Sequence, residues 1–316
     1  MNYFITGGTG FIGTHLSSLL HEVHPETRIY NLDIVEPGTP LPTVKNYKPA
    51  LGKGEEHAAT FIYCDVRQPI KLEKVNITPD DVIFNFAAVH RTPGHPDPAY
   101  FETNIRGAEN VCAFAERHGI RKIVFTSSIA PYGAAEELKE ETTLPMPNTP
   151  YGISKLVAEK IHQTWQAGGE GRQLTIVRPG VVFGRGENGN FTRLYWGIRG
   201  HKFMYPGRKD TIKACIYVKE LVRFMLYRLE HHDSGVELYN CCYEPAYTIE
   251  HIVESMKRVT NMKVKVPFMP GWLIMTAAGI AGALGSPMGI CPARVRKLQI
   301  STNICGKKLS ASGYRF

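Results

Sequence analysis

Cysteine is scarce in this chain of 316 residues, which has seven cysteines and no pair with the C-x-x-C spacing that zinc and redox sites use. Cys241 and Cys242 are adjacent, which makes them poor disulfide partners for each other. The chain also lacks a basic segment with a cleavage site ahead of its first apolar residues, so we expect no signal peptide. These absences argue against a disulfide scaffold and a metal site, and they favour a cytoplasmic protein.

Acidic residues are fewer than basic ones, 29 against 37, which gives a net charge of +8. Such a balance suits an anionic ligand or a nucleic acid. The lysines and arginines are scattered along the sequence rather than clustered in one run. We therefore expect an anionic small-molecule substrate and no nucleic-acid partner.

Long apolar runs are also absent, with one partial exception at residues 266–293, which contain no Asp, Glu, Lys or Arg. Prolines and glycines interrupt this stretch, and only residues 271–284 read as a continuous helix. That helix is too short to span a bilayer. We expect a buried or interfacial helix of the substrate-binding region, and peripheral membrane contact through 271–284 remains an open alternative.

A glycine loop stands between the first apolar run, residues 2–6, and the first helical pattern, residues 11–21. It reads Gly7-Gly8-Thr9-Gly10-Phe11-Ile12-Gly13. Glycines at 7, 10 and 13 let the backbone approach a diphosphate, and the helix N-terminus offers free N–H groups and a positive dipole end. Tight strand-to-helix turns use the same residues, but the position and flanking periodicity favour a dinucleotide site.

The second predicted strand ends at Asp33, 20 residues after Gly13. An acidic side chain there can accept hydrogen bonds from the adenosine ribose hydroxyls and would repel a 2′-phosphate. Ile34 and Val35 supply no arginine to receive such a phosphate. The cofactor is therefore predicted to be NAD.

Strands and helices alternate through the first half of the chain, which predicts a Rossmann-type, doubly wound parallel α/β sheet. Beyond residue 178 the alternation loosens. We expect an NAD-binding Rossmann domain at 1–178, and at 179–316 a mixed region that completes the sheet and forms a smaller substrate-binding domain. The predicted strands are 2–6, 28–34, 59–64, 81–88, 122–127 and 174–177, with helices at 11–21, 100–118 and 151–166, and an irregular surface insertion at 36–58.

Tyr151 and Lys155 are four residues apart at the start of a predicted helix, so the phenol and the ammonium share one face. A nearby cation favours the phenolate, and this predicts a lowered pKa for Tyr151. Tyr151 could then take the proton of a substrate hydroxyl while hydride leaves the same carbon. A Tyr-x-x-x-Lys spacing alone occurs by chance on many helices. The glycine loop upstream is the feature that favours a catalytic role for this pair.

Together these residues resemble the extended short-chain dehydrogenases/reductases, and within them the nucleotide-sugar epimerase/dehydratase group. The resemblance covers the chain nearly end to end. The matching segments are the glycine loop, Asp65-Val66 as the adenine-contacting pair, Phe86-Ala87-Ala88 beneath the cofactor, the serine loop from Ser127 to Gly133, Pro150 to Lys155, Arg178-Pro179-Gly180 and Tyr217-Val218.

The resemblance implies a role for each matched position. Ser128 would be the third catalytic residue beside Tyr151 and Lys155, and Asn104 would steady the active site. The implied cofactor contacts are Gly7, Gly10, Phe11, Ile12, Gly13, Asp33, Asp65, Val66, Ala87, Ala88, Asn104, Tyr151 and Lys155. The candidate substrate contacts are Ser128, Asn190, Arg193, Arg208 and Lys213.

Departures from the family pattern narrow the chemistry. Ile129 and Ala130 stand where the dehydratases carry the Asp-Glu pair that removes water, which argues against dehydration. Val181 replaces an asparagine that touches the sugar nucleotide in many epimerases. Lys213 replaces an arginine of the galactose epimerases and lacks the guanidinium fork. The last two departures leave the substrate open.

The expected activity is NAD-dependent epimerisation of a nucleotide sugar at C4, with a UDP-sugar as substrate, a 4-keto intermediate and no metal. Two alternatives stay open. One is a reductase of a 4-keto nucleotide sugar that consumes NAD(P)H, and the other is a non-catalytic NAD-binding regulator. The resemblance also implies a homodimer.

Overall fold

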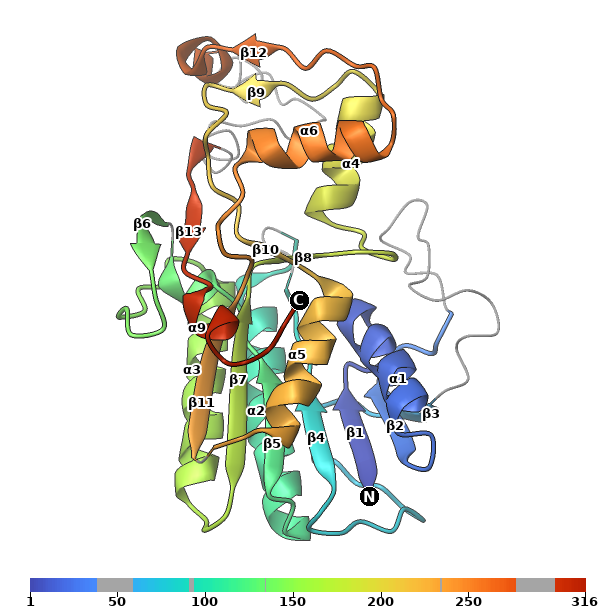
Figure 1. Cartoon of the computed structure of the whole chain (residues 1–316). Helices are drawn as coiled ribbons and strands as arrows, with labels where there is room; N and C mark the ends of the chain where they lie inside the picture. Colours follow the sequence, from blue (N-terminus) through green and yellow to red (C-terminus); the bar gives the residue numbers. More distant parts are fainter. Residues whose placement is uncertain (39–58, 91–93, 134, 234, 277–298) are drawn as a thin grey trace.

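The computed structural model describes residues 1–38, 59–90, 94–133, 135–233, 235–276 and 299–316. Its centre is a seven-stranded sheet in the order β11-β7-β5-β4-β1-β2-β3, in which every neighbouring pair is parallel (Figure 1). The strands are β1 (Asn2–Thr6), β2 (Arg28–Asp33), β3 (Thr60–Tyr63), β4 (Val82–Asn85), β5 (Lys122–Thr126), β7 (Gln173–Pro179) and β11 (Val236–Cys241). The predicted Rossmann-type sheet is confirmed.

Helices cover both faces of this sheet (Figure 1). On one face α1 (Phe11–Val23) packs beside α5 (Val218–Glu230), and on the other α2 (Asp97–His118) packs beside α3 (Pro150–Ala167). Because successive side chains of a strand point to opposite faces, Tyr3 and Ile5 join the core under α1 and α5, whereas Phe4 joins the core under α2 and α3. This two-sided burial explains why the central strands are almost wholly apolar.

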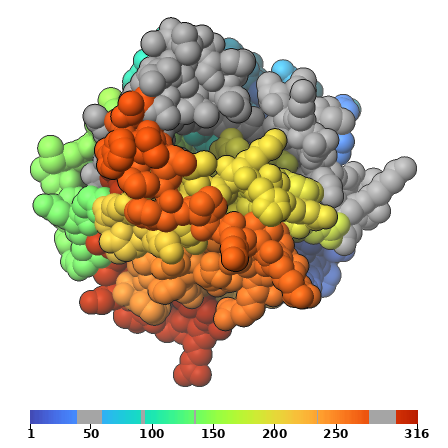
Figure 2. All heavy atoms as spheres, turned by 90° about the horizontal axis from the view of Figure 1, so that it is seen from above, coloured from blue at the N-terminus to red at the C-terminus, as the bar shows by residue number. Residues whose placement is uncertain are grey.

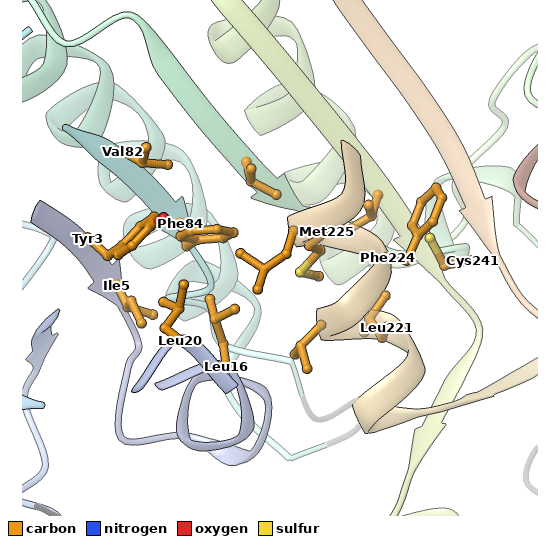
Figure 3. Packing of buried hydrophobic residues seen from close by; sticks show 14 of the residues in the cluster. Tyr3, Ile5, Leu16, Leu20, Val82, Phe84, Leu221, Phe224, Met225 and Cys241 are labelled. Atoms are coloured by element: carbon orange, nitrogen blue, oxygen red, sulfur yellow. The ribbon is translucent and has the colours of Figure 1, made fainter. Parts of the chain in front are cut away.

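Figure 3 shows the core on the α1 and α5 face, where Ile5 and Phe84 of the sheet lie beside Leu16 of α1, and Phe224 of α5 lies further along the same core. None of these four side chains is accessible to solvent. Burial of each contributes roughly 1.5–3 kcal/mol. The core therefore holds the carboxyl ends of β1 and β4 in fixed positions.

The sheet order reverses direction between β1 and β4, because the chain first builds outward through β2 and β3 and then returns to place β4 on the other side of β1. In doubly wound sheets, ligands bind outside the carboxyl ends of the strands at this switch point. The loops that leave β1, β4 and β5 there begin at Gly7, Phe86 and Ser127. These three loops carry residues predicted to bind the cofactor or to form the active site.

The second half of the chain both completes the sheet and builds a small lobe beyond its carboxyl edge (Figure 1). Strand β11 and helix α5 return to the sheet, whereas α4 (Asn190–Arg199), β9 (Tyr205–Pro206), α6 (Ile249–Val259) and β12 (Phe268–Met269) form the lobe. Its core contains Ile198, Tyr205 and Val253. The remaining elements are η2 (Ala130–Tyr132), β6 (Ala135–Lys139), β8 (Val181–Phe183), β10 (Cys215–Tyr217), β13 (Thr302–Ile304) and α9 (Lys307–Ser310).

Two sequence predictions fall wholly or partly outside the described residues. Most of the insertion at 36–58 does so, and of the predicted helix 271–284 the structure describes residues 271–276, which are helical. Among the helices that the structure describes, none combines the length and the apolar character needed to cross a membrane.

Candidate active site

The glycine loop forms a cradle in which added side chains have no room. Gly7 has a φ of +69°, and a Cβ there would lie 2.8 Å from the backbone nitrogen of Ala87. A Cβ on Gly13 would lie 2.6 Å from Gly8 Cα. Gly10 precedes α1 and provides no side-chain cap, so the first N–H groups of that helix remain available to a ligand. These features fit the diphosphate of a dinucleotide.

Asp33 closes one side of this cradle. One carboxylate oxygen accepts a hydrogen bond from the Thr9 backbone at 3.2 Å, and the other accepts bonds from the Ile34 and Val35 backbone at 2.7 and 3.3 Å. The loop after β1 and the end of β2 are thereby tied together. The fixed carboxylate stands where the ribose of NAD is expected.

The predicted adenine contacts, Asp65 and Val66, follow β3 directly. Arg67 binds the Asp65 carboxylate through two nitrogens, with an Nη2–Oδ2 distance of 2.6 Å, and this hydrogen bonding holds the pKa of Asp65 below its usual range. Val66 is buried, and its carbonyl accepts a hydrogen bond from Asn110 at 2.8 Å. Both positions are rigidly held, and their contact with adenine stays a prediction.

Asn104 connects the segment after β4 to the active-site helix. Its side chain bonds both the N–H and the carbonyl of Val89, at 2.9 and 3.1 Å, and donates to Ser154 Oγ at 2.9 Å. The side chain is buried. Within the described residues its polar atoms are thus engaged by the protein, which fits the expectation that Asn104 steadies the active site better than the expectation of a direct cofactor contact.

Ser128 and Tyr151 are brought together although they are far apart in the sequence. Ser128 stands in the loop after β5, and Tyr151 in the first turn of α3, which Thr149 caps by accepting a hydrogen bond from the Gly152 N–H at 3.1 Å. The Ser128 side chain lies beside the Tyr151 phenol and acts to lower its pKa. This is the contact expected of two groups that share one reacting oxygen.

Lys155 lies one turn further along α3 and is 2% exposed. Its ammonium stands 4.5 Å from the centre of the Phe125 ring, and burial lowers the pKa of Lys155 to about 7. Burial also raises the pKa of Tyr151 to about 12, against a smaller lowering by Ser128. The predicted lowering of the Tyr151 pKa by Lys155 is therefore wrong, because burial disfavours the phenolate and also lowers the pKa of the lysine.

A buried ion pair beneath these residues was missed by the sequence analysis. Glu159 follows Lys155 by one further turn of α3, and both oxygens of its carboxylate bind the Arg178 guanidinium of β7, at 2.8 and 2.6 Å. The Ser127 hydroxyl donates to the same carboxylate at 2.5 Å. Glu159 and Arg178 are 1% and 3% exposed. The pair therefore joins α3, β7 and the serine loop close to the predicted catalytic residues.

The ion pair could have been anticipated from one signal. Tyr151, Lys155 and Glu159 are spaced four residues apart, so their side chains share one face of the helix. An acidic side chain on the same face as the phenol and the lysine indicates a third polar group near them. In the sequence, Arg178 stands out only as part of the Arg178-Pro179-Gly180 segment that matches the family. Its guanidinium pairs with Glu159 and lies 4.7 Å above the Tyr132 ring, whose hydroxyl donates to Asn240 at 2.9 Å.

The candidate substrate contacts lie on separate elements. Arg193 donates to Asn190 at 2.8 Å in the first turn of α4, and both residues are exposed. Arg208 pairs with Asp210 and Glu136 at 2.9 and 2.8 Å, and Lys213 donates to the carbonyl of Ile300 at 2.7 Å. Each side chain is held by a protein partner, and its contact with substrate stays a prediction.

Fold and site together define a Rossmann-type oxidoreductase with a Ser-Tyr-Lys centre. Residues 3–242 match the NAD dependent epimerase/dehydratase family, and because this is most of the chain, the protein belongs to that family. The predicted family, NAD cofactor and epimerase-type enzyme are thus confirmed.

Individual relatives agree with this assignment. The chain is 31% identical to an N-acetyl-α-D-glucosaminyl-diphospho-ditrans,octacis-undecaprenol 4-epimerase of Escherichia coli O157:H7, over 99% of this chain and 90% of the relative. It is 29% identical to a UDP-glucose 4-epimerase of Halalkalibacterium halodurans, over 85% of this chain and 84% of the relative. In fold it is similar to a UDP-glucuronic acid 4-epimerase from Bacillus cereus in complex with NAD, with a TM-score of 0.69, 21% identity and coverage of 86% and 88%.

Proposed function

We propose that the protein inverts C4 of a sugar carried on a diphosphate, with one molecule of NAD retained through the cycle. The observation that carries this proposal is the placement of Ser128 beside Tyr151 and buried Lys155, at the same sheet edge as the glycine cradle. The absence of an acidic pair after Ser128 supports epimerisation over dehydration, because Ile129 and Ala130 offer no acid or base.

The residues divide the chemistry among them. Bound NAD supplies a reversible hydride acceptor for the C4 hydrogen. Tyr151 takes the proton of the C4 hydroxyl, and Ser128 hydrogen-bonds the reacting oxygen while C4 becomes a ketone. After the sugar has rotated in the site, Tyr151 would give the proton back to the oxygen as C4 is reduced on its opposite face. Lys155, one turn along the same helix, would hold the nicotinamide ribose of bound NAD.

The second part of the proposal is the identity of the group that carries the sugar. A UDP-sugar is the expectation from the sequence. The relative that acts on an undecaprenyl diphosphate sugar aligns with 99% of this chain, whereas the UDP-glucose 4-epimerase aligns with 85%. Val181 also replaces an asparagine expected for nucleotide sugars. We therefore favour a polyprenyl diphosphate carrier and keep UDP as the alternative.

The test is an incubation of the purified protein, without added cofactor, with UDP-N-acetylglucosamine and separately with polyprenyl diphosphate N-acetylglucosamine in detergent. Formation of the C4-inverted sugar on either carrier supports epimerisation, and preference for the lipid-linked sugar supports the favoured carrier. Turnover only with stoichiometric NAD(P)H would contradict epimerisation and support the reductase. Bound NAD without turnover of either sugar would point to the non-catalytic alternative.

The homodimer is also a proposal, with α2 and α3 as the contact. Ile153 and Val157 are 40% and 36% exposed and stand one turn apart on α3, which is the spacing of an apolar stripe. Burial of such a stripe against a second copy of the chain would stabilise a dimer. Light scattering should give twice the chain mass of 35.3 kDa, and Val157→Lys should halve it.

A further inference from the structure

Positive charge gathers in the small lobe. Residues 190–209 and 249–276 contain nine Lys or Arg and two Asp or Glu, in a chain whose net charge is +8. Along the sequence these cations look scattered, but the fold brings the two stretches together through the pairing of β9 with β12 and the core around Ile198 and Tyr205. The cations are Arg193, Arg199, Lys202, Arg208, Lys209, Lys257, Arg258, Lys263 and Lys265, and the acids are Glu250 and Glu254.

The same lobe exposes large apolar side chains. Trp272 is 71% exposed, Trp196 55% and Phe268 52%, and Leu273 and Met204 are exposed as well. Figure 2 shows β12 with residues 271–276 beside the segment from α4 to β9 on the face seen from above. The lobe has its own core, so these side chains are not needed to build it. Exposed aromatic residues on neighbouring segments of one lobe are typical of an interaction surface.

We propose that this face, which we call the lobe face and define by Trp196, Phe268, Trp272 and Leu273 with Arg199 and Lys202, docks on an anionic lipid bilayer. Tryptophan and phenylalanine insert at the boundary between headgroups and acyl chains, and lysine and arginine are attracted to anionic headgroups. The lobe face combines both kinds of residue and carries few acids.

The position of the lobe relates membrane docking to the active site. The lobe lies beyond the carboxyl edge of the sheet, which is the edge that holds Ser128 and Tyr151 (Figure 1). A sugar diphosphate whose lipid tail stays in the bilayer would therefore reach the reacting groups from the lobe side. This inference rests on the proposed lipid-linked substrate, and it identifies the part of the chain that meets the membrane.

The experiment is sedimentation of the full-length protein with vesicles of phosphatidylglycerol and with vesicles of phosphatidylcholine. We expect binding to the anionic vesicles, with a loss of about fivefold for each lobe-face cation removed, as in Arg199→Gln and Lys202→Gln. Trp272→Ser should weaken binding further. Leu144→Ser is the matched control, because Leu144 is 77% exposed but lies outside the lobe. Unchanged melting temperatures would show that the variants are folded.

Several results would overturn the inference. The inference is wrong if the protein binds both vesicle types equally, or if the lobe-face variants bind as the wild type does. It is also wrong if Leu144→Ser loses as much binding as those variants. Binding to a DNA duplex as tight as to anionic vesicles would point to an unspecific cation surface. The proposed function fails separately: vesicle binding without epimerisation of the lipid-linked sugar would contradict the carrier, whereas epimerisation in detergent with no vesicle binding would contradict the docking alone.

Discussion

The sheet half and the lobe use their polar side chains in opposite ways. Around Tyr151 the ionisable groups are buried, and Glu159 and Arg178 satisfy each other across two elements. In the lobe the cations lie at the surface, and Arg208 pairs with exposed Asp210. A site that moves protons and hydride requires fixed, dry groups, whereas a surface that meets an anionic partner requires accessible charge. The two halves therefore respond differently to the same kind of substitution.

The largest effect is expected for Tyr151→Phe, which removes the group that exchanges the proton and little else. Turnover should fall by about 10²–10⁴-fold, the usual contribution of a general acid–base. Bound NAD, released by denaturation and measured by absorbance, should remain near the wild-type amount. Full activity in this variant would show that the buried centre is not catalytic.

Glu159→Gln tests the buried ion pair near the proposed catalytic residues. Because Arg178 would be left buried and uncompensated, we expect the free energy of unfolding to fall by about 3–5 kcal/mol in urea denaturation. Glu159 also raises the pKa of Lys155, so its removal should lower that pKa and move the alkaline limit of activity to lower pH.

The control for that variant keeps the local charge balanced. Glu159→Gln combined with Arg178→Met removes both charges and should recover much of the lost stability. Arg178→Met alone leaves a negative Glu159 and should move the alkaline limit to higher pH, opposite to Glu159→Gln. Shifts of the same sign in the two single variants would mean that the pair acts through packing alone.

Lys155→Met tests whether burial of Lys155 lowers the free energy of unfolding. Its folded pKa of about 7 is below the unfolded value, so the unfolded chain binds more protons between about pH 7 and 10.5. The wild type should therefore gain stability as pH rises through this window. At pH 6.5 the variant should be more stable by at least about 1.4 kcal/mol, the equivalent of one pKa unit, and the difference should vanish near pH 10.5.

Lys160→Met is the matched control for the pH experiment. Lys160 lies on the same helix, but it is exposed and donates to Gln163 at 3.0 Å. Its replacement should leave the pH dependence of urea unfolding as in the wild type. A pH-dependent change as large as that of Lys155→Met would mean that burial is not the cause.

The sequence predicted the sheet half well because its signals are local. Strand β1 has the predicted limits, β2 and β5 each end one residue earlier than predicted, and β3 is one residue shorter at each end. Strand β4 ends at Asn85 rather than at residue 88, since the chain must leave the sheet to pass beside Gly7. The glycines, Ser128, Tyr151 and Lys155 could be named because each belongs to a short motif.

What could not be predicted depends on packing between distant segments. Glu159 and Arg178 are 19 residues apart, and only the approach of α3 to β7 makes them partners. The lowered pKa expected for Tyr151 failed for the same reason, because burial is not visible in a spacing. In the lobe, Arg208 meets Glu136, which is 72 residues away. Charge counts along the chain could not show that the lobe collects the cations.

Gly13→Ala tests the backbone packing that the motif encodes. The new Cβ would lie 2.6 Å from Gly8 Cα, so backbone must move, and overpacking of this kind costs about 1–3 kcal/mol. Both urea stability and bound NAD should fall. Gly10→Ala is the control, because its Cβ would lie 3.1 Å from the Gly7 carbonyl oxygen and needs a smaller shift. It should keep stability near the wild type, and equal loss in both variants would argue against close packing at Gly13.

Arg208→Gln should have the smallest effect, because exposed ion pairs contribute little to stability. Its side chain is 39% exposed, and its guanidinium divides its bonds between Asp210 and Glu136. We expect a melting temperature within about 2 °C of the wild type, measured by differential scanning fluorimetry. A rise in KM without a change in kcat would support the predicted substrate contact, since it would indicate binding lost equally in ground and transition states. A fall in kcat together with a large loss of stability would instead place Arg208 with the buried groups of the sheet half, and the contrast between the two halves would not hold.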